Sequence, residues 1–404
     1  MRILWVKVGG LWPLTTGGRL RSFHLVSELA RRHDVRVLTT HGPGDDPEGL
    51  ARQLSHCAEV RSVPYEIPRQ GTGRFAFSLL RSWSSPMPAD MWKCRVAALR
   101  DEVARRLAAG EADVCVADFL HAVSNVPLNG RRVPMVFFAH NVEFQIWKRL
   151  RDHANQPWKR ALLEIEWRKM RRYEREVCRR ATLTLAVSDL DRDMLGAAAP
   201  GSRVVAIPTG VDTRYFTPDE SRERPHHLVF TGAMDWYPNE DAILHFLERT
   251  LPRIRAAVPD ATLTIVGRNP SPRLREAASC AGVEVTGTVD DVRPYVLAGA
   301  VSIVPLRIGG GTRLKIFEAL AMGKAVVSTG IGAEGLPLEP GRHFVRADEP
   351  EAFAAAVVDL LLHGDRRRAL GRAGRALVDE HYSWAQVSRT LERRLSEAMV
   401  THAR

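Results

Sequence analysis

The segment GGGTRLKIFEALAMGKAVVST, residues 309–329, places side chains that can bind an anion at the start of an expected helix. Its leading glycines let backbone approach a ligand closely, and Thr312 is a residue type that caps helices. Arg313 and Lys315 fall in the first turn, where each cation costs about 0.3–1 kcal/mol because free N–H groups already make that end positive. A bound diphosphate would offset both charges, whereas two solvated surface cations are the alternative. Glu318, one turn further on, can accept hydrogen bonds from a sugar diol or pair with Lys315 inside the helix.

A second glycine loop, with Gly17 and Gly18, follows the first apolar run of the chain and precedes a helical pattern. Strand, glycine turn and helix in this order are typical of loops that approach phosphates. The loop lacks the full G-x-G-x-x-G pattern, so a simple tight turn explains it equally well.

His140 is the one histidine of fourteen whose place in the chain suggests chemistry. It comes directly after the apolar run Met135–Phe138, where a parallel strand exposes side chains at a crevice. An imidazole there can donate to a substrate hydroxyl or a sugar oxygen near neutral pH. A structural histidine bonded to backbone is the alternative.

The elements that must position these residues are short apolar strands alternating with amphipathic helices. This pattern predicts an α/β fold with two doubly wound Rossmann-like domains facing a central cleft. In the first half we expect strands at 3–8, 35–38, 114–117, 135–138, 183–187 and 204–207. In the second half we expect them at 228–230, 263–266, 283–286, 301–305 and 325–328.

Composition shifts give the expected domain boundaries. Residues 1–207 form the first domain and 228–380 the second, and the polar, Pro/Gly-bearing segment 208–227 links them. Residues 381–404 predict a helix that begins after Ser383 and packs either on its own domain or back on the first.

Composition and charge narrow the class of protein. The 404 residues, 45% of them hydrophobic, suffice for two cores of about 200 residues each. No apolar stretch approaches the roughly 18 residues of a membrane span, and the first ten residues lack the core of a secretory signal, which favours a cytoplasmic protein. Five scattered cysteines indicate neither a metal clip nor a disulfide pair. A net charge of +11 favours anionic partners: nucleic acid, anionic lipid or phosphorylated substrates.

Taken together, these residues resemble the retaining glycosyltransferases of family 4, which have the GT-B fold. The likeness extends over essentially the whole chain. Its motifs are TTGGRLRSFHLVSELA, FAHN, AVSDLDRDML, VVAIPTGVDTRYF, LVFTGAMDWYPNEDAI, LTIVGR, VEVTGTVDDVRPYV, GGGTRLKIFEALAMGKAVVST and GAEGL.

The resemblance implies that the second domain binds a nucleotide-diphosphate sugar. It assigns Glu318 to the ribose, and Arg268 and Val289 to the nucleoside. The groups it places near the diphosphate are the Gly310–Gly311 turn, the backbone of Thr312 and Leu314, and the side chains of Arg313 and Lys315. His140 would touch the donor sugar, and Gly17 and Gly18 would let the first domain close over the phosphates. No metal or other cofactor is expected, because Arg and Lys can take over the leaving-group charge.

Two positions depart from the family pattern. A glutamate eight positions before Glu318 is common in the family, but Gly310 stands there. The Arg and downstream Lys that usually follow the first strand of the nucleotide domain are also absent. They are replaced by Ala233 and by Asp235, Trp236 and Asn239. Our hypothesis is that Arg313 and Lys315 perform the phosphate duty of the absent pair.

Two stretches of the first half concern the acceptor. Residues 73–95 mix aromatic and basic side chains, which fits either an acceptor-gripping, lipid-facing element or core. Residues 143–180 hold twelve Lys/Arg against six Asp/Glu, which suits an anionic membrane surface, a pyrophosphate-linked acceptor or a solvated helix face. Nucleic acid is not expected, since no reading motif accompanies the charge.

The leading prediction is therefore a metal-independent retaining glycosyltransferase of cell-surface polysaccharide or glycolipid synthesis. Its partners would be a nucleotide sugar and a hydroxyl acceptor, either free or lipid-linked. The enzyme would be cytoplasmic, either free or peripheral at the inner face of the membrane. A nucleotide-sugar epimerase or hydrolase of the same fold and a non-catalytic nucleotide-sugar-binding scaffold are the alternatives.

Overall fold

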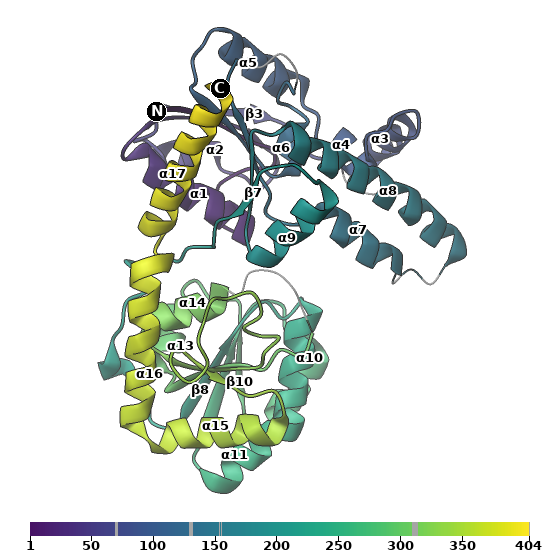
Figure 1. Ribbon diagram of the computed structural model, residues 1–404. Coiled ribbons are helices and arrows are strands. Elements are labelled where there is room, and N and C mark those ends of the chain that lie inside the picture. Colours follow the sequence, from purple (N-terminus) through teal and green to yellow (C-terminus); the bar gives the residue numbers. More distant parts are fainter. Residues whose placement is uncertain (69–71, 129–131, 153, 155, 309–313, 404) are drawn as a thin grey trace. The chain divides into compact units, whose positions relative to one another are not determined.

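The chain forms two compact units, each built on a parallel sheet. The computed structural model describes residues 1–68, 72–128, 132–152, 154, 156–308 and 314–403. Unit 1 is Met1–Pro208 together with the chain from Val387 onward, and unit 2 is Thr209–Gln386. Both sheets are parallel, and helices connect their successive strands except β12 and β13 (Figure 1), so the predicted fold class of two doubly wound α/β domains is confirmed.

Unit 1 has a seven-stranded sheet in the order β3-β2-β1-β4-β5-β6-β7. The strands are β1 (Arg2–Lys7), β2 (Asp34–His41), β3 (Glu59–Pro64), β4 (Val114–Asp118), β5 (Met135–Phe138), β6 (Leu183–Ala186) and β7 (Val204–Ala206). Strand β4, VCVAD, is buried throughout, as expected for a central parallel strand. The edge strand β3 was not predicted, because none of its six residues is buried and its sequence, EVRSVP, lacks an apolar run.

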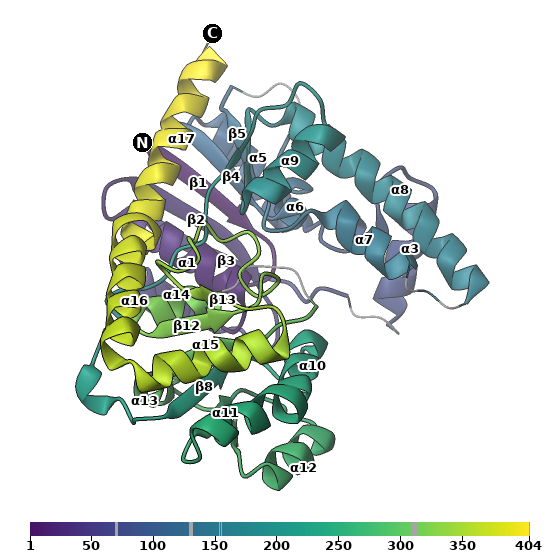
Figure 2. The ribbon, with the colours of Figure 1, turned by 60° about the horizontal axis from the view of Figure 1, so that its bottom comes forward.

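Helices connect these strands. They are α1 (Gly17–Ala30), α2 (Pro47–Gln53), α3 (Gly73–Trp83), α4 (Ala89–Trp92), α5 (Ala97–Ala108), α6 (Leu120–Val123), α7 (Glu143–Asp152), α8 (Pro157–Arg180) and α9 (Asp189–Ala198). In Figures 1 and 2, α3 and the α7–α8 hairpin project from the same side of unit 1. The Lys169 ammonium of α8 donates to the Ser82 carbonyl of α3 at 2.8 Å, which joins the two.

Unit 2 has a six-stranded sheet in the order β10-β9-β8-β11-β12-β13. The strands are β8 (His227–Thr231), β9 (Thr262–Val266), β10 (Glu284–Gly287), β11 (Val301–Val304), β12 (Ala325–Ser328) and β13 (Val345–Arg346). The short helix η1 (Glu220–Arg222) precedes β8. Between and after the strands come α10 (Tyr237–His245), η2 (Phe246–Thr250), α11 (Leu251–Ala257), α12 (Pro272–Cys280), α13 (Arg293–Ala298), α14 (Leu314–Ala321), α15 (Pro350–Leu362), α16 (Gly364–Leu377) and η3 (Val378–Tyr382). The sequence did not predict β13, whose two residues are too few to form a pattern.

The predicted linker, residues 208–227, packs on unit 2 from Thr209 onward. Val211 and Phe216 are buried in the core of this unit. The Arg375 guanidinium donates to the Phe216 carbonyl at 2.8 Å. Two apolar side chains spaced five apart do not make a helical or strand period, which is why the segment was interpreted as an unpacked linker.

The C-terminal helix α17 (Trp384–Ala403) begins after Ser383, whose hydroxyl accepts from the Gln386 N–H at 3.4 Å. Leu391 and Leu395 are fully buried. Glu392 pairs with Arg32, just beyond α1, at 2.9 Å, and α17 passes α1 in Figure 1. The later part of the helix therefore belongs to unit 1, which is the second of the two placements considered from the sequence.

Candidate functional site

In each sheet the first strand is central, the next two strands add on one side of it, and the later strands add on its other side. The reversal lies between β1 and β4 in unit 1 and between β8 and β11 in unit 2. Crevices that bind ligands in such sheets open at the carboxyl ends of the strands at this reversal point. The residues that end these four strands therefore border the expected crevice of each unit.

In unit 1 the reversal point carries a buried ion pair. Lys7 ends β1 and lies in register with Asp118, which ends β4. The Lys7 ammonium is 3.1 Å from one Asp118 oxygen and donates to the Ser22 hydroxyl at 3.0 Å. The indole N–H of Trp5 donates to the same carboxylate at 2.9 Å. All four side chains are buried, so this charge pair is compensated inside the protein.

The pair positions His140. His140 Nε2 lies 2.7 Å from the other Asp118 oxygen, and its ring stacks on Phe119 with centroids 3.7 Å apart. Burial raises the pKa of Asp118, but the Lys7 charge and the hydrogen bond from His140 outweigh it and hold that pKa well below its ordinary value. Burial, aided by the charges of Arg21 and Lys7, lowers the pKa of His140 to about 4 despite Asp118.

His140 is therefore neutral at pH 7, with its proton on Nε2, facing the ionised Asp118. The other ring nitrogen, Nδ1, then offers a lone pair. The sequence predicted that this imidazole donates to substrate; the geometry instead assigns its proton to Asp118 and leaves Nδ1 as an acceptor. A substrate hydroxyl would donate to it.

Gly18 lies under the same cluster. A Cβ atom there would come within 2.5 Å of the Phe119 ring, so the absence of a side chain lets Phe119 approach α1. Phe119 itself has a φ of +72°, an unusual conformation for a residue with a side chain. The structure thus brings Gly18 and His140 together through Phe119. Gly17 is the exposed first residue of α1, and its predicted role at phosphates stays a prediction.

In unit 2 a lysine reaches over the reversal point. The Lys315 ammonium, from the first turn of α14, donates to Asn239 Oδ1 at 3.0 Å and lies 4.1 Å from the centroid of the Phe230 ring in β8. Asn239 in turn donates to the Ala233 carbonyl at 2.8 Å. A Cβ on Gly232 would lie 2.7 Å from the Lys315 nitrogen. The cation of α14 thus lies beside Gly232 and Asn239, in the loop after β8 where the resemblance expects an Arg and a Lys.

Glu318 lies one turn further along α14 and is partly exposed. Burial raises its pKa to about 7, although the Lys315 charge lowers it. A pKa this close to neutral lets a ligand favour either the ionised or the neutral carboxyl. Leu314, at the start of α14, is partly buried, whereas the predicted residues Gly310, Gly311, Thr312 and Arg313 lie outside the described residues.

Arg268 and Val289 follow β9 and β10, so both lie along the carboxyl edge of the unit 2 sheet. The Arg268 guanidinium is 3.5 Å from Asp235, and its carbonyl accepts from the Met234 N–H at 2.9 Å. The loop after β8 is therefore joined to Arg268. Val289 is partly exposed further along the edge.

Sequence reasoning missed Lys7, Ser22 and Asp118. A usable signal was present: a Lys and an Asp each end an apolar strand at positions that are otherwise buried, and buried charges need partners.

Two families match the chain. Residues 17–215 match the model of the family described as Glycosyltransferase Family 4, and residues 225–363 match that of Glycosyl transferases group 1. The phosphatidyl-myo-inositol mannosyltransferase of Mycolicibacterium smegmatis is 32% identical over 229 residues, which cover 52% of this chain and only 55% of that protein. The MMP alpha-(1->4)-mannosyltransferase of Mycolicibacterium hassiacum is 26% identical over 381 residues, 90% of each chain.

Among solved structures, Anabaena Alr3699/HepE in complex with UDP and glucose superimposes with a TM-score of 0.65. The superposition covers 98% of this chain and 99% of that one, at 15% sequence identity. At this identity the likeness supports the fold alone.

Proposed function

The chain belongs to the glycosyltransferases of the group 1 and family 4 type, and from this premise we propose that it transfers a sugar, with retention, from a nucleotide-diphosphate sugar to a hydroxyl acceptor. The two relatives described above, from Mycolicibacterium smegmatis and Mycolicibacterium hassiacum, are named as mannosyltransferases. A protein of the same fold is bound to UDP and glucose. A GDP- or UDP-linked hexose is accordingly the first donor to test.

The observation that carries the proposal is Lys315 at the reversal point of unit 2. Its ammonium is held by Asn239 and Phe230 at the edge where nucleotides bind in doubly wound sheets. A cation fixed in this way suits the diphosphate, and Glu318 one turn away suits the ribose hydroxyls. The hypothesis that Lys315 performs the duty of the absent Arg and Lys is consistent with its contact to Asn239.

The chemistry would need little from the protein beyond charge and orientation. Lys315 would stabilise the negative charge that grows on the leaving diphosphate, without a metal ion. The leaving phosphate would accept the proton of the attacking hydroxyl on the same face of the sugar, which retains the anomeric configuration. His140, neutral and held by Asp118, would accept a hydrogen bond from a sugar hydroxyl through Nδ1.

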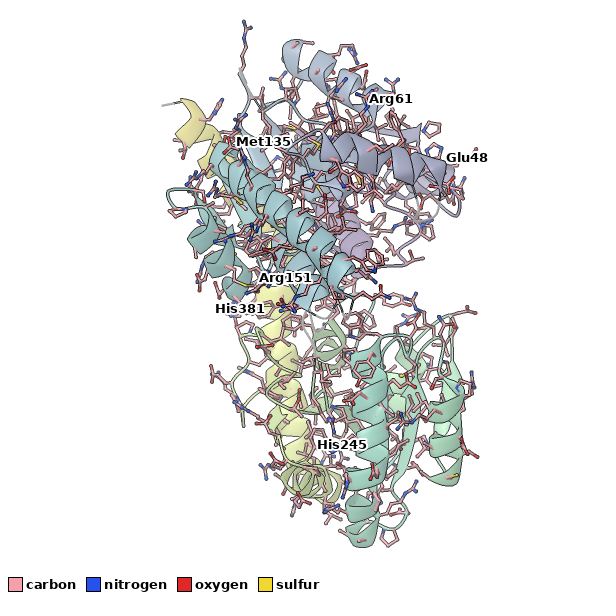
Figure 3. All side chains as sticks on the ribbon, turned by 90° about the vertical axis from the view of Figure 1, so that its right-hand side faces the viewer. Glu48, Arg61, Met135, Arg151, His245 and His381 are labelled. Atoms are coloured by element: carbon pink, nitrogen blue, oxygen red, sulfur yellow. The ribbon has the colours of Figure 1, made fainter. Side chains whose placement is uncertain are left out.

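We also propose that the enzyme acts at an anionic membrane surface. No helix in the described part of the chain is both long and apolar enough to cross a bilayer. On α8, however, Trp158, Leu162 and Ile165 follow one helical stripe and are 64%, 41% and 51% exposed. Arg151 of α7, labelled in Figure 3, stacks on Trp167 at 4.5 Å and pairs with Glu164 at 2.7 Å, so the hairpin presents this stripe as a fixed surface.

The charge of the same hairpin is complementary to anionic lipid. Residues 143–180 hold twelve Lys/Arg and six Asp/Glu, and three of the acids, Glu143, Glu166 and Glu174, are buried. The accessible surface is thus more basic than the sequence count suggests. Exposed apolar side chains beside Lys and Arg are typical of helices that lie in a membrane interface.

A thermal-shift screen over UDP-, GDP-, ADP- and CMP-sugars tests the donor site. A donor present at a hundred times its Kd should stabilise the fold by about 2.7 kcal/mol. The Lys315→Met variant should lose about half of this stabilisation or more, as expected for binding that is about tenfold weaker or worse. The anomeric coupling of the product and turnover in the presence of a chelator then test retention and metal independence. Donor consumption that is equally fast without any acceptor would favour the hydrolase or epimerase instead, and no stabilisation by any nucleotide sugar would refute the proposal.

A further inference from the structure

Unit 1 holds a cavity of about 550 Å³ that the proposed donor chemistry does not use. This size lies within the range of about 300–1,000 Å³ that is typical of small-molecule sites. The side chains that matter for its chemistry are Tyr65, Phe77, Arg81, Trp92, Arg95 and Arg100. We call this cavity the α3 pocket, because α3 contributes one wall.

The α3 pocket is positively charged. Three arginines, Arg81, Arg95 and Arg100, line it, and none of the described residues of its lining is acidic. Within the described part of the chain, neither Arg81 nor Arg95 forms an ion pair, and Arg100 has only Asp101, at 3.7 Å on the exposed side of α5. Three guanidinium groups around one cavity repel each other unless an anion lies among them. The pocket therefore favours an anionic ligand.

Aromatic rings support two of these arginines. The Arg95 guanidinium lies 4.7 Å from the centroid of the Trp92 ring, and that of Arg81 lies 5.3 Å from Phe77. A guanidinium stacked on a ring is held flat, with its N–H edges turned toward other acceptors. The Trp92 indole N–H is buried and has no hydrogen-bond partner among the described residues. The wall thus combines apolar surface with donors that match phosphate oxygens.

The backbone that carries Arg95 is fixed from two sides. The Asn125 side chain accepts from the Val96 N–H at 2.7 Å and donates to the Cys94 carbonyl at 2.9 Å. The Tyr65 hydroxyl donates to the Lys93 carbonyl at 2.5 Å. Since these contacts bracket Arg95, its position does not depend on a ligand, and binding loses little entropy in ordering the site.

The outer side of α3 indicates where an apolar part of the ligand would go. Phe77, Leu80 and Trp83 follow one side of this helix and are 59%, 61% and 59% exposed. Phe77 also lines the pocket, so an apolar surface leads from the pocket to the outside of the helix.

From these features we infer that the α3 pocket binds a phosphate or diphosphate group attached to an apolar chain. The arginines would hold the phosphate oxygens, and the aromatic wall and the outer side of α3 would hold the chain. If the proposed glycosyltransferase function holds, this amphiphile is the sugar acceptor or the carrier of the acceptor. Only this assignment rests on the proposed function, which it deepens.

Isothermal titration of the full chain with farnesyl diphosphate, inorganic pyrophosphate and farnesol tests the inference. We expect farnesyl diphosphate to bind at least tenfold more tightly than either of the other two, because each of them lacks one half of the ligand. Arg95→Gln should weaken its binding about tenfold or more, as expected for the loss of a charged hydrogen-bonding group. Arg52→Gln, which removes an exposed arginine of α2 outside the pocket, is the matched control and should bind as the wild type does.

The possible results are distinguishable. Equal affinity for pyrophosphate and farnesyl diphosphate, or for farnesol and farnesyl diphosphate, would overturn the inference, as would unchanged binding by an Arg95→Gln variant of normal melting temperature. Competition by phosphatidylglycerol vesicles would assign the phosphate to a membrane lipid headgroup, and its absence would assign it to a separate prenyl-type carrier. The thermal shift produced by the nucleotide sugar should survive in Arg95→Gln, so failure of the donor site and failure of the α3 pocket are separate outcomes.

Discussion

Replacing Lys7 by methionine is the sharpest test of how unit 1 is built. Methionine has nearly the length of lysine without its charge, so the change removes the ammonium and leaves the space filled. Asp118 then loses a partner at 3.1 Å and Ser22 loses a donor at 3.0 Å, inside a region that solvent does not reach. Trp5 and His140 would be the remaining partners of the carboxylate.

The expected cost follows from that burial. Removing one partner of a buried ion pair typically destabilises a protein by about 3–5 kcal/mol, because an uncompensated charge remains. For a unit of this size the midpoint of thermal unfolding should fall by roughly 6–20 °C, at about 2–4 °C per kcal/mol. The pKa of His140 should also rise from about 4, since the Lys7 charge is one of the influences that lower it.

The change in His140 has a defined sign in pH. Its folded pKa of about 4 lies below the ordinary value of 6.5, so the unfolded chain binds the proton first as the pH falls. As the pH falls from about 6.5 to about 4, this histidine therefore lowers the free energy of unfolding. In Lys7→Met that slope should flatten, because the two pKa values lie closer together.

Urea unfolding across pH and the NMR titration of His140, identified by its absence in His140→Gln, measure both effects. Lys324→Met is the matched control, because Lys324 is also buried and pairs with Glu223 at 3.1 Å in unit 2. It should lower stability without moving the His140 titration. The double variant Lys7→Met/Asp118→Asn should be more stable than the sum of the single changes indicates. A wild-type midpoint for Lys7→Met, or an unmoved His140 titration, would refute this account of the cluster.

Three further outcomes are expected. Lys315→Met should weaken nucleotide-sugar binding about tenfold or more, as measured by calorimetry, with an unchanged melting temperature in the absence of ligand. Donor affinity of the wild type should rise between pH 6 and pH 8, through the pKa of Glu318 near 7, and Glu318→Gln should abolish this pH dependence. Trp158→Ser and Leu162→Ser should reduce cosedimentation with anionic vesicles, whereas Leu362→Ser, which removes a comparably exposed side chain from unit 2, should not.

The sequence predicted the central strands because parallel strands buried on both faces must be apolar along their whole length. Met135–Phe138 and Ala325–Ser328 have the predicted bounds for this reason. An edge strand needs no such run, so β3, with no buried residue, left no apolar pattern to recognise. The stripe of Leu391 and Leu395 identified α17, but which unit it covers depends on contacts such as Arg32–Glu392, between residues distant in sequence.

The candidate site was predictable only in part, for a related reason. His140 could be singled out because its place after a strand is a local property. The partnership of Lys7 with Asp118 depends on which strands become neighbours, and these two residues lie 111 positions apart. Likewise, Ala233 and Asn239 could be identified as departures from the family pattern, but only the fold shows that Lys315 contacts Asn239.

The two reversal points each carry a lysine, and their surroundings differ in a way that bears on binding. Lys7 is buried against the ionised Asp118 carboxylate, so its charge is neutralised inside the protein and has a structural role. Lys315 contacts the neutral amide of Asn239, and its charge lowers the pKa of Glu318. Because that pKa is near 7, the charge of the site depends on pH. If Glu318 meets the ribose hydroxyls, its ionised form is the better acceptor and donor affinity rises with pH. If it meets the diphosphate instead, ionisation adds repulsion and affinity falls. The diphosphate of a nucleotide sugar does not titrate near pH 7, because each of its phosphates carries one ester and one anhydride bond and keeps a single, strongly acidic oxygen. The sign of the slope therefore reports which part of the donor Glu318 contacts.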